Sequence, residues 1–155
     1  MPALAVFGML KPDLKISLPE LYDEDETAWL EEMSRILSER RFHELDAENL
    51  SEYLLDMSRR DKREVLSRLT KLLVHLLKSE HQTERRSNSW RATIASQRNE
   101  LKDLLESKTL LNHAAQVLGK AYGRAVKQAA LEAGFDEQLF PAECPFSLNH
   151  ILGDE

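Results

Sequence analysis

The strongest constraint on the fold is an apolar stripe between residues 65 and 77. Seven aliphatic side chains recur there at offsets of 0, 1, 4, 7, 8, 11 and 12: Val65, Leu66, Leu69, Leu72, Leu73, Leu76 and Leu77. This spacing follows the 3.6-residue period of an α-helix and places all seven on one face. The sequence therefore predicts a helix that lies centrally in the molecule and buries this face.

The chain before this stripe predicts a helix that begins after the acidic run 23–26 and closes at Arg41. It carries one apolar stripe: Trp29, Leu30, Met33, Ile36 and Leu37. Carboxylates near the start of a helix and cations near its end both interact favourably with the helix dipole. We expect Phe42 and Leu45 to fill the turn that follows.

A second stripe comes just before the central one. Four of its side chains share a helix face: Leu50, Tyr53, Leu54 and Met57. Asp46 is suited to cap the start of this helix, and Asp61 can cap a new start after the stripe fades. However, no Gly or Pro interrupts residues 47–79. The sequence leaves open whether these residues form two helices or one kinked helix.

Two further helices are expected in the second half of the chain. One ends near Glu106, and polar side chains such as Gln97 interrupt its stripe. The other begins at Ser107 or Thr109, and Gly134 can cap its end. The many alanines of this last helix imply that a neighbouring helix approaches it closely.

Together these elements predict an all-α fold, an antiparallel bundle of four to five helices with a packed C-terminal tail. Residues 1–20 contain three prolines and no sustained period, so we expect an extended or partly ordered arm there. Residues 21–155 would form a single helical bundle domain. A chain of 155 residues with 42% hydrophobic side chains is sufficient for one core.

The composition excludes several classes of protein. A single cysteine, Cys144, rules out an internal disulfide framework and a cysteine-rich zinc site. The apolar stretch 3–10 is too short to cross a bilayer and lacks the flanks of a signal peptide. We therefore expect a cytoplasmic protein with no membrane partner.

Charge is distributed unevenly along the chain. The net charge is −6, but residues 1–58 carry 5 Lys and Arg against 14 Asp and Glu, a balance of −9. Residues 59–102 carry 12 against 5, a balance of +7. This basic block can attract an anion such as nucleic acid or phosphate, or acidic segments can neutralise it inside the molecule. An acidic chain repels polyanions at long range, which favours the second interpretation.

The densest candidate site is the segment 84–98. It holds four arginines and a tryptophan: Arg85, Arg86, Trp90, Arg91 and Arg98. A helix start offers free backbone N–H groups, and arginines beside it can complete a site for an anion or a partner. Arg91 and Arg98 are seven residues apart and so lie on nearly the same helix face. In the alternative interpretation these arginines form a structural ion-pair network and Trp90 lies in the core.

The same segment carries a resemblance to a known family. RRSNSWRATIASQR, preceded by HLLK and by ENL earlier in the chain, resembles a family of small bacterial, largely cyanobacterial, proteins known only as domain of unknown function number twenty-nine. LYDEDETAWLEE and FPAECPFSLNHIL are similar to the two ends of its pattern, so the resemblance covers about residues 21–152. Glu26 and Thr27 depart from the aromatic residues expected there. The resemblance implies an all-helical bundle and brings no established activity, cofactor or catalytic residue.

Other candidate groups favour structural roles. His75 and His81 are six residues apart, which is not the i, i+4 spacing of two metal ligands on one helix face. Three carboxylates do align on one face, at Glu48, Glu52 and Asp56. Arg60 continues their row and favours a solvated ion-pair ladder over an acid–base or metal site. Cys144 lies among prolines and Phe146 and is expected to be packed rather than nucleophilic.

The sequence therefore predicts a non-catalytic function. It lacks a glycine-rich phosphate loop, GxSxG and HExxH, so we expect no catalytic residue, metal or cofactor. The favoured hypothesis is an interaction or regulatory module that binds a protein partner, with a homo-oligomer as a further arrangement. The alternative is a nucleic-acid or phosphate-binding protein that uses the arginine-rich segment 85–98. A third hypothesis is an enzyme with an acid–base or metal site on the second helix.

Overall fold

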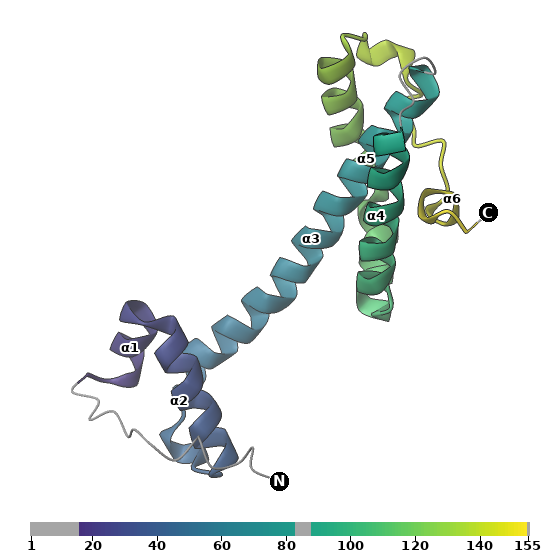
Figure 1. Cartoon of the computed structure of the whole chain (residues 1–155). Helices are drawn as coiled ribbons and strands as arrows, with labels where there is room; N and C mark the ends of the chain where they lie inside the picture. The colour runs from purple at the N-terminus through teal and green to yellow at the C-terminus, as the bar shows by residue number, and fades with distance from the viewer. Residues whose placement is uncertain (1–15, 83–87, 155) are drawn as a thin grey trace. The chain divides into compact units, whose positions relative to one another are not determined.

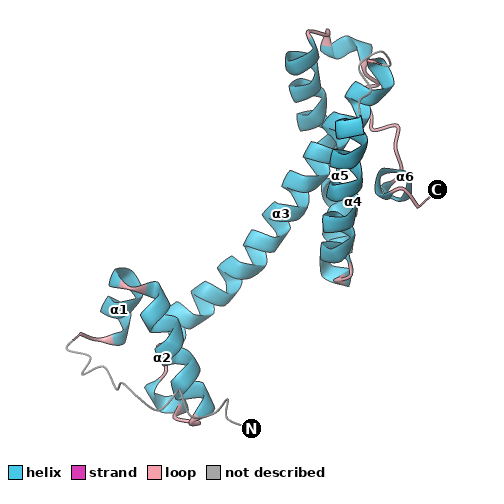
Figure 2. Ribbon diagram, viewed as in Figure 1, coloured by secondary structure: helices cyan, strands magenta, loops and turns pink. Residues whose placement is uncertain are grey.

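The computed structural model describes residues 16–82 and 88–154. Within these residues the chain forms six α-helices and two short 3-10 helices, with no strand (Figure 2). The predicted all-α class is therefore confirmed. The helices, labelled in Figure 1, belong to two compact units, residues 1–56 and 57–155. The interpretation of residues 21–155 as a single domain stays a prediction.

The first unit begins with two short helices, α1 (Leu18–Glu24) and α2 (Glu26–Ser38). Ser17 caps α1 in a capping box, in which its side chain and backbone both bond to the residue three positions on. Pro19 lies in the first turn, where no backbone N–H is needed. Residues 18–20, which the sequence assigned to an extended or partly ordered arm, are therefore helical. The first fifteen residues of the predicted arm lie outside the described part.

Trp29 is the centre of the first unit's core. Its side chain is completely buried in a cluster with Leu21, Met33 and Ile36. The indole N–H donates to Oδ2 of Asp46 at 3.1 Å, so the one polar atom of the ring is satisfied. The core of this unit therefore combines an apolar cluster with one hydrogen bond to the residue that precedes the next long helix.

The turn after α2 is a 3-10 helix, η1 (Phe42–Glu44). The prediction that Phe42 fills this turn is wrong, because its side chain is 59% exposed. Leu45 does pack on the core cluster, as predicted. The rings of Tyr22 and Tyr53 lie beside the indole of Trp29, with centroids 4.7 and 5.9 Å from its own.

Residues 47–79 form part of one helix, α3 (Ala47–His81), which is 35 residues long. This settles the choice that the sequence left open. Asp46 accepts a hydrogen bond from the backbone N–H of Asn49, as expected of the residue that caps the helix. The absence of Gly and Pro from this stretch explains why the helix can continue without a break.

The predicted apolar face of the first turns of α3 is only partly buried. Leu50 and Tyr53 pack against the core of the first unit. Leu54 and Met57 are 58% and 49% exposed, so the prediction that they share the buried face is wrong for them. Along α3 the core of the first unit reaches Tyr53 and that of the second begins at Val65, which leaves the turns between them uncovered.

The second unit contains the C-terminal half of α3 with α4 (Asn88–Leu105), α5 (Lys108–Ala133), the 3-10 helix η3 (Glu137–Leu139) and α6 (Leu148–Leu152). The central stripe is buried as the sequence predicts. Five of its members are at most 1% exposed: Val65, Leu69, Leu72, Leu73 and Leu77. This stripe is the α3 side of a core to which α4, α5 and α6 all contribute.

Helix α5 shows the capping and the close packing that its sequence predicts. Ser107 accepts a hydrogen bond from the backbone N–H of Leu110, and Gly134 ends the helix with a φ of 71°. This left-handed conformation favours glycine. Four alanines of the helix are completely buried: Ala114, Ala121, Ala125 and Ala129. Because alanine is small, these positions let neighbouring elements pack close to the α5 backbone.

The C-terminal tail packs on the second unit, as expected. Four of its side chains are buried in the core: Phe140, Phe146, Ile151 and Leu152. The Tyr122 hydroxyl of α5 donates to the carbonyl oxygen of Pro141 at 2.7 Å and holds the tail backbone against that helix. The tail is therefore an integral part of this unit.

Replacing Leu73 by alanine should destabilise the second unit by about 2–5 kcal/mol, because it removes a completely buried side chain and leaves a cavity. Leu131→Ala is the matched control, since Leu131 is 85% exposed on α5, and it should change stability by less than about 0.5 kcal/mol. Urea unfolding followed by circular dichroism measures both. Equal losses in the two variants would contradict the assignment of the core.

Candidate functional site

Two of the candidate arginines line one surface groove in the second unit. Arg91 and Arg98 lie on α4 and face a groove of about 370 Å³ whose other wall includes Leu152 and Gly153 at the end of α6. Arg85 and Arg86 lie outside the described residues. The seven-residue spacing therefore does bring two arginines together at one surface.

Arg98 binds the last turn of α6. Its Nε donates to the carbonyl oxygen of Ile151 at 2.9 Å, and a terminal guanidinium nitrogen donates to that of His150 at 3.3 Å. The last carbonyls of a helix lack partners within the helix, so a cation that binds them acts as a cap. Arg98 thus has a structural role, although its partners are backbone carbonyls and not the carboxylates that the sequence suggested.

Two neighbouring contacts strengthen this attachment. Lys102, one turn further along α4, pairs with Asp154 at 2.5 Å. Gly153 has a φ of 78°, and a Cβ at this position would lie 3.1 Å from the guanidinium of Arg98. Gly153 therefore leaves space for the Arg98 side chain, because only glycine adopts this left-handed conformation without strain and carries no Cβ.

Trp90 takes part in a contact between α4 and α3. It is partly buried, and Nζ of Lys78 lies 5.4 Å from its ring centroid, within the range of a cation–π interaction. Lys78 also pairs with Glu132 of α5 at 2.9 Å. Hydrogen bonds from Gln128 and Lys78 lower the pKa of the Glu132 carboxyl. Trp90 thus lies next to a contact that joins three helices.

Gln97, which interrupts the apolar stripe of α4, is buried beside a charged side chain. The Arg68 guanidinium on α3 donates to the Gln97 side-chain oxygen at 3.4 Å, pairs with Glu64 at 2.6 Å and also pairs with Glu100 of α4. Within the second unit, acidic side chains therefore neutralise part of the basic block. Gln97 therefore interrupts the apolar stripe of α4 because its side chain accepts a hydrogen bond from Arg68 of α3.

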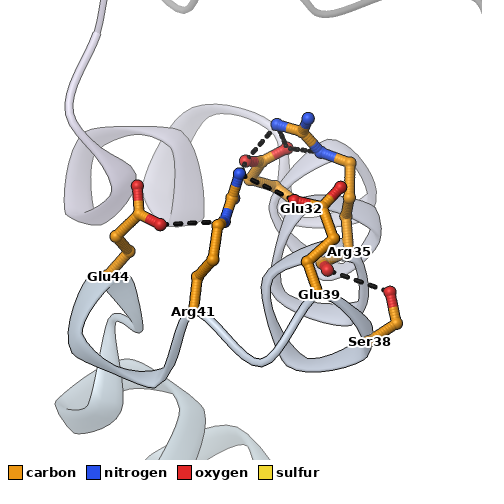
Figure 3. Close-up of polar contacts among 6 residues, drawn as sticks. All are labelled: Glu32, Arg35, Ser38, Glu39, Arg41 and Glu44. Carbon is orange, nitrogen blue, oxygen red and sulfur yellow. Dashed lines mark hydrogen bonds and ion pairs between the residues drawn. The ribbon is translucent and has the colours of Figure 1, made fainter.

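A second network of charges lies in the first unit (Figure 3). Arg41 pairs with Glu39 and Glu44, both at 2.8 Å, and lies 3.8 Å from Glu32. Glu32 in turn accepts hydrogen bonds from Arg35 at 2.6–3.0 Å. These contacts connect the end of α2 to η1. Their role is structural, because every charged group in the network has a partner of opposite sign.

The remaining candidates are the thiol of Cys144 and the carboxylates of α3. Burial raises the pKa of the Cys144 thiol, which lies 3.5 Å from the carbonyl oxygen of Phe146, so the reactive thiolate is disfavoured. Glu48 and Glu52 are exposed on α3. Among residues 16–82 and 88–154, no three or more His, Cys, Asp or Glu gather as a metal site would require.

One surface feature was not predicted from the sequence. A groove of about 600 Å³ lies between α3 and α5 in the second unit, and Arg63, Lys71 and Arg124 line it. Its signal in the sequence is a row of polar residues at i, i+4 and i+8 on α3. That row can be recognised as part of a site only when the residues of α5 opposite it are known.

Fold and candidate sites together define an all-helical protein of two compact units, in which several ion pairs join helices within the same unit. A family model described as Domain of unknown function DUF29 matches residues 21–155, so the chain belongs to this family. No curated protein and no solved structure matches the chain. None of the helices in the described part is both long and apolar enough to cross a membrane.

Arg98→Ala should loosen the last turn of α6 against α4 and cost on the order of 1 kcal/mol, because two hydrogen bonds from a charged donor are lost while Ile151 and Leu152 stay buried in the core. Hydrogen exchange should become faster at residues 148–152 and change little in α5. Arg91→Ala is the control, since this exposed side chain faces the same groove without a hydrogen bond to α6 in the described structure. Unchanged exchange at α6 in Arg98→Ala would refute the capping role.

His75 should make the stability of the protein depend on pH. Burial lowers the pKa of the His75 side chain, and the nearby Lys78 and Lys71 lower it further, while Glu132 opposes them. The unfolded state therefore binds more protons once the pH falls below about 6.5, and stability decreases as the pH is lowered through that value. Thermal unfolding of His75→Gln should show a smaller decrease, and an identical one would contradict this assignment.

Proposed function

We propose that the protein is a non-catalytic interaction or regulatory module that binds a protein partner through its first unit. The proposal also takes the protein to act in the cytoplasm without a cofactor. The observation that carries it is a pair of adjacent leucines exposed on α3. Leu54 and Leu55 are 58% and 51% exposed, although they lie on a helix that buries its apolar face elsewhere.

Burial of such side chains in an interface would be favourable. Fully burying one leucine contributes about 1.5–3 kcal/mol relative to leaving it in water, so two neighbouring leucines can supply much of a binding energy. Single exposed apolar residues are common on protein surfaces and need no explanation. Two large ones in succession, with the exposed Phe42 in the same unit, favour an interaction surface.

The charge around these leucines indicates what kind of partner would fit. Residues 1–58 have a balance of −9, and Glu48 and Glu52 are exposed before the leucine pair on α3, while Arg59 and Arg60 are exposed about one turn after it. A complementary surface would present apolar side chains flanked by Lys and Arg. We therefore propose that the partner is a protein with a basic, amphipathic segment.

The double variant Leu54→Glu, Leu55→Glu should lose the partner, because it places two charges where apolar burial is required. Ser51→Glu is the control: Ser51 is exposed one turn earlier on α3, so the added charge lies on the same helix without removing an apolar side chain. The unmodified chain, Ser51→Glu and the double variant are each tagged and isolated from the protein's own cells, and their masses under native conditions are compared.

We expect a heavier complex for the unmodified chain and for Ser51→Glu, and a monomer mass for the double variant. Circular dichroism checks that α3 remains helical in all three forms. A monomer mass for the unmodified chain, or a complex that survives the double substitution, would rule out this function for the leucine pair. A mass of twice the chain would identify the partner as a second copy.

A further inference from the structure

The groove between α3 and α5 in the second unit brings two rows of polar side chains together. On α3 the row is Arg63, Ser67 and Lys71, spaced four residues apart and therefore on one face. On α5 the row is Arg124 and Gln128, with the same spacing. The pair between Lys78 and Glu132 joins the same two helices at one end of these rows.

The groove has an excess of positive charge. Arg63, Lys71 and Arg124 form no ion pair within the described residues, and all three side chains are exposed. The neighbouring Arg68 differs, because it pairs with two carboxylates. Glu132 is the one carboxylate that lines the groove, and it is already bound by Lys78 and Gln128. Three cations therefore face the groove without a counter-charge from the described part of the protein.

The geometry indicates the size and chemistry of a ligand. Arg63 and Lys71 are eight residues apart, which is about 12 Å along the helix axis. A volume of about 600 Å³ lies within the usual range for small-molecule sites. Arginine pairs with phosphate and carboxylate through two parallel hydrogen bonds, whereas lysine acts as a point charge. Such a row suits several linked anionic groups better than a single one.

A nucleic acid fits this groove less well than a short chain of phosphates. Among the described residues no Phe, Tyr or Trp lines it, and His75 carries the single ring on which a base could stack, whereas single-strand sites stack successive bases on several rings. We propose that the α3–α5 groove is a binding site for a small polyphosphate, held by Arg63, Lys71 and Arg124. The shared chemistry is the phosphate chain, whether free or as part of a nucleoside triphosphate.

Isothermal titration of the full chain with inorganic tripolyphosphate at low salt tests this site. We expect binding that weakens as salt is added, because all three cations are exposed. The triple variant Arg63→Gln, Lys71→Gln, Arg124→Gln should weaken it by roughly tenfold or more, since hydrogen bonds to charged groups are lost. Lys108→Gln, Lys120→Gln, Lys127→Gln is the matched control, because it removes three exposed positive charges of α5 that do not line the groove.

Two further titrations, with adenosine triphosphate and with adenosine monophosphate, test whether the phosphate chain is the group that the groove recognises. Adenosine triphosphate should bind about as well as tripolyphosphate, and adenosine monophosphate much more weakly, if the phosphate chain is what is recognised. Absence of tripolyphosphate binding, or equal losses in the two triple variants, would overturn the site. So would adenosine triphosphate binding without tripolyphosphate binding. Thermal unfolding confirms that both triple variants are folded. These outcomes do not depend on Leu54 and Leu55, so the proposed function is tested separately.

Discussion

The burial of one face of α3 is the interaction on which the rest of the structure depends. Its C-terminal half supplies a continuous aliphatic surface from Val65 to Leu77, and α4, α5 and the tail all pack into the same core. Its first turns supply Leu50 and Tyr53 to a different cluster around Trp29. One uninterrupted helix thus contributes to two separate hydrophobic cores.

Several charged side chains in this protein connect one helix to another element or cap a helix end. Arg41 connects η1 to the end of α2, and Arg98 caps α6. Arg68 joins α3 to α4. In each case the partner lies within the same compact unit, so the uneven charge along the chain does not prevent local neutralisation. The three cations of the α3–α5 groove have no such partner within the described residues and line one cavity together, and for that reason they support a ligand site.

The sequence predicts those features that depend on local chemistry. The helix period places the stripe from Val65 to Leu77, and the capping roles of Ser107 and Gly134 follow from their own conformational preferences. Periodicity indicates which side chains share a helix face, but it does not indicate whether another element covers that face. For this reason the sequence assigns Leu54 and Met57 to a buried face, whereas both side chains are exposed. Arg98 could be recognised as unusual, but its partners lie more than fifty residues later, and no local pattern identifies them. The role of the arginine segment as a binding site stays a prediction.

The uncovered middle of α3 has a consequence for how the chain can break. From Leu54 to Asp61 every residue is exposed, so these turns are held mainly by the hydrogen bonds of their own backbone. A helical stretch of this length is marginal in water without tertiary packing. Fraying or proteolytic cleavage there would expose no buried side chain of either core. A break at this point would therefore remove backbone hydrogen bonds of α3 but no buried apolar contact of either core.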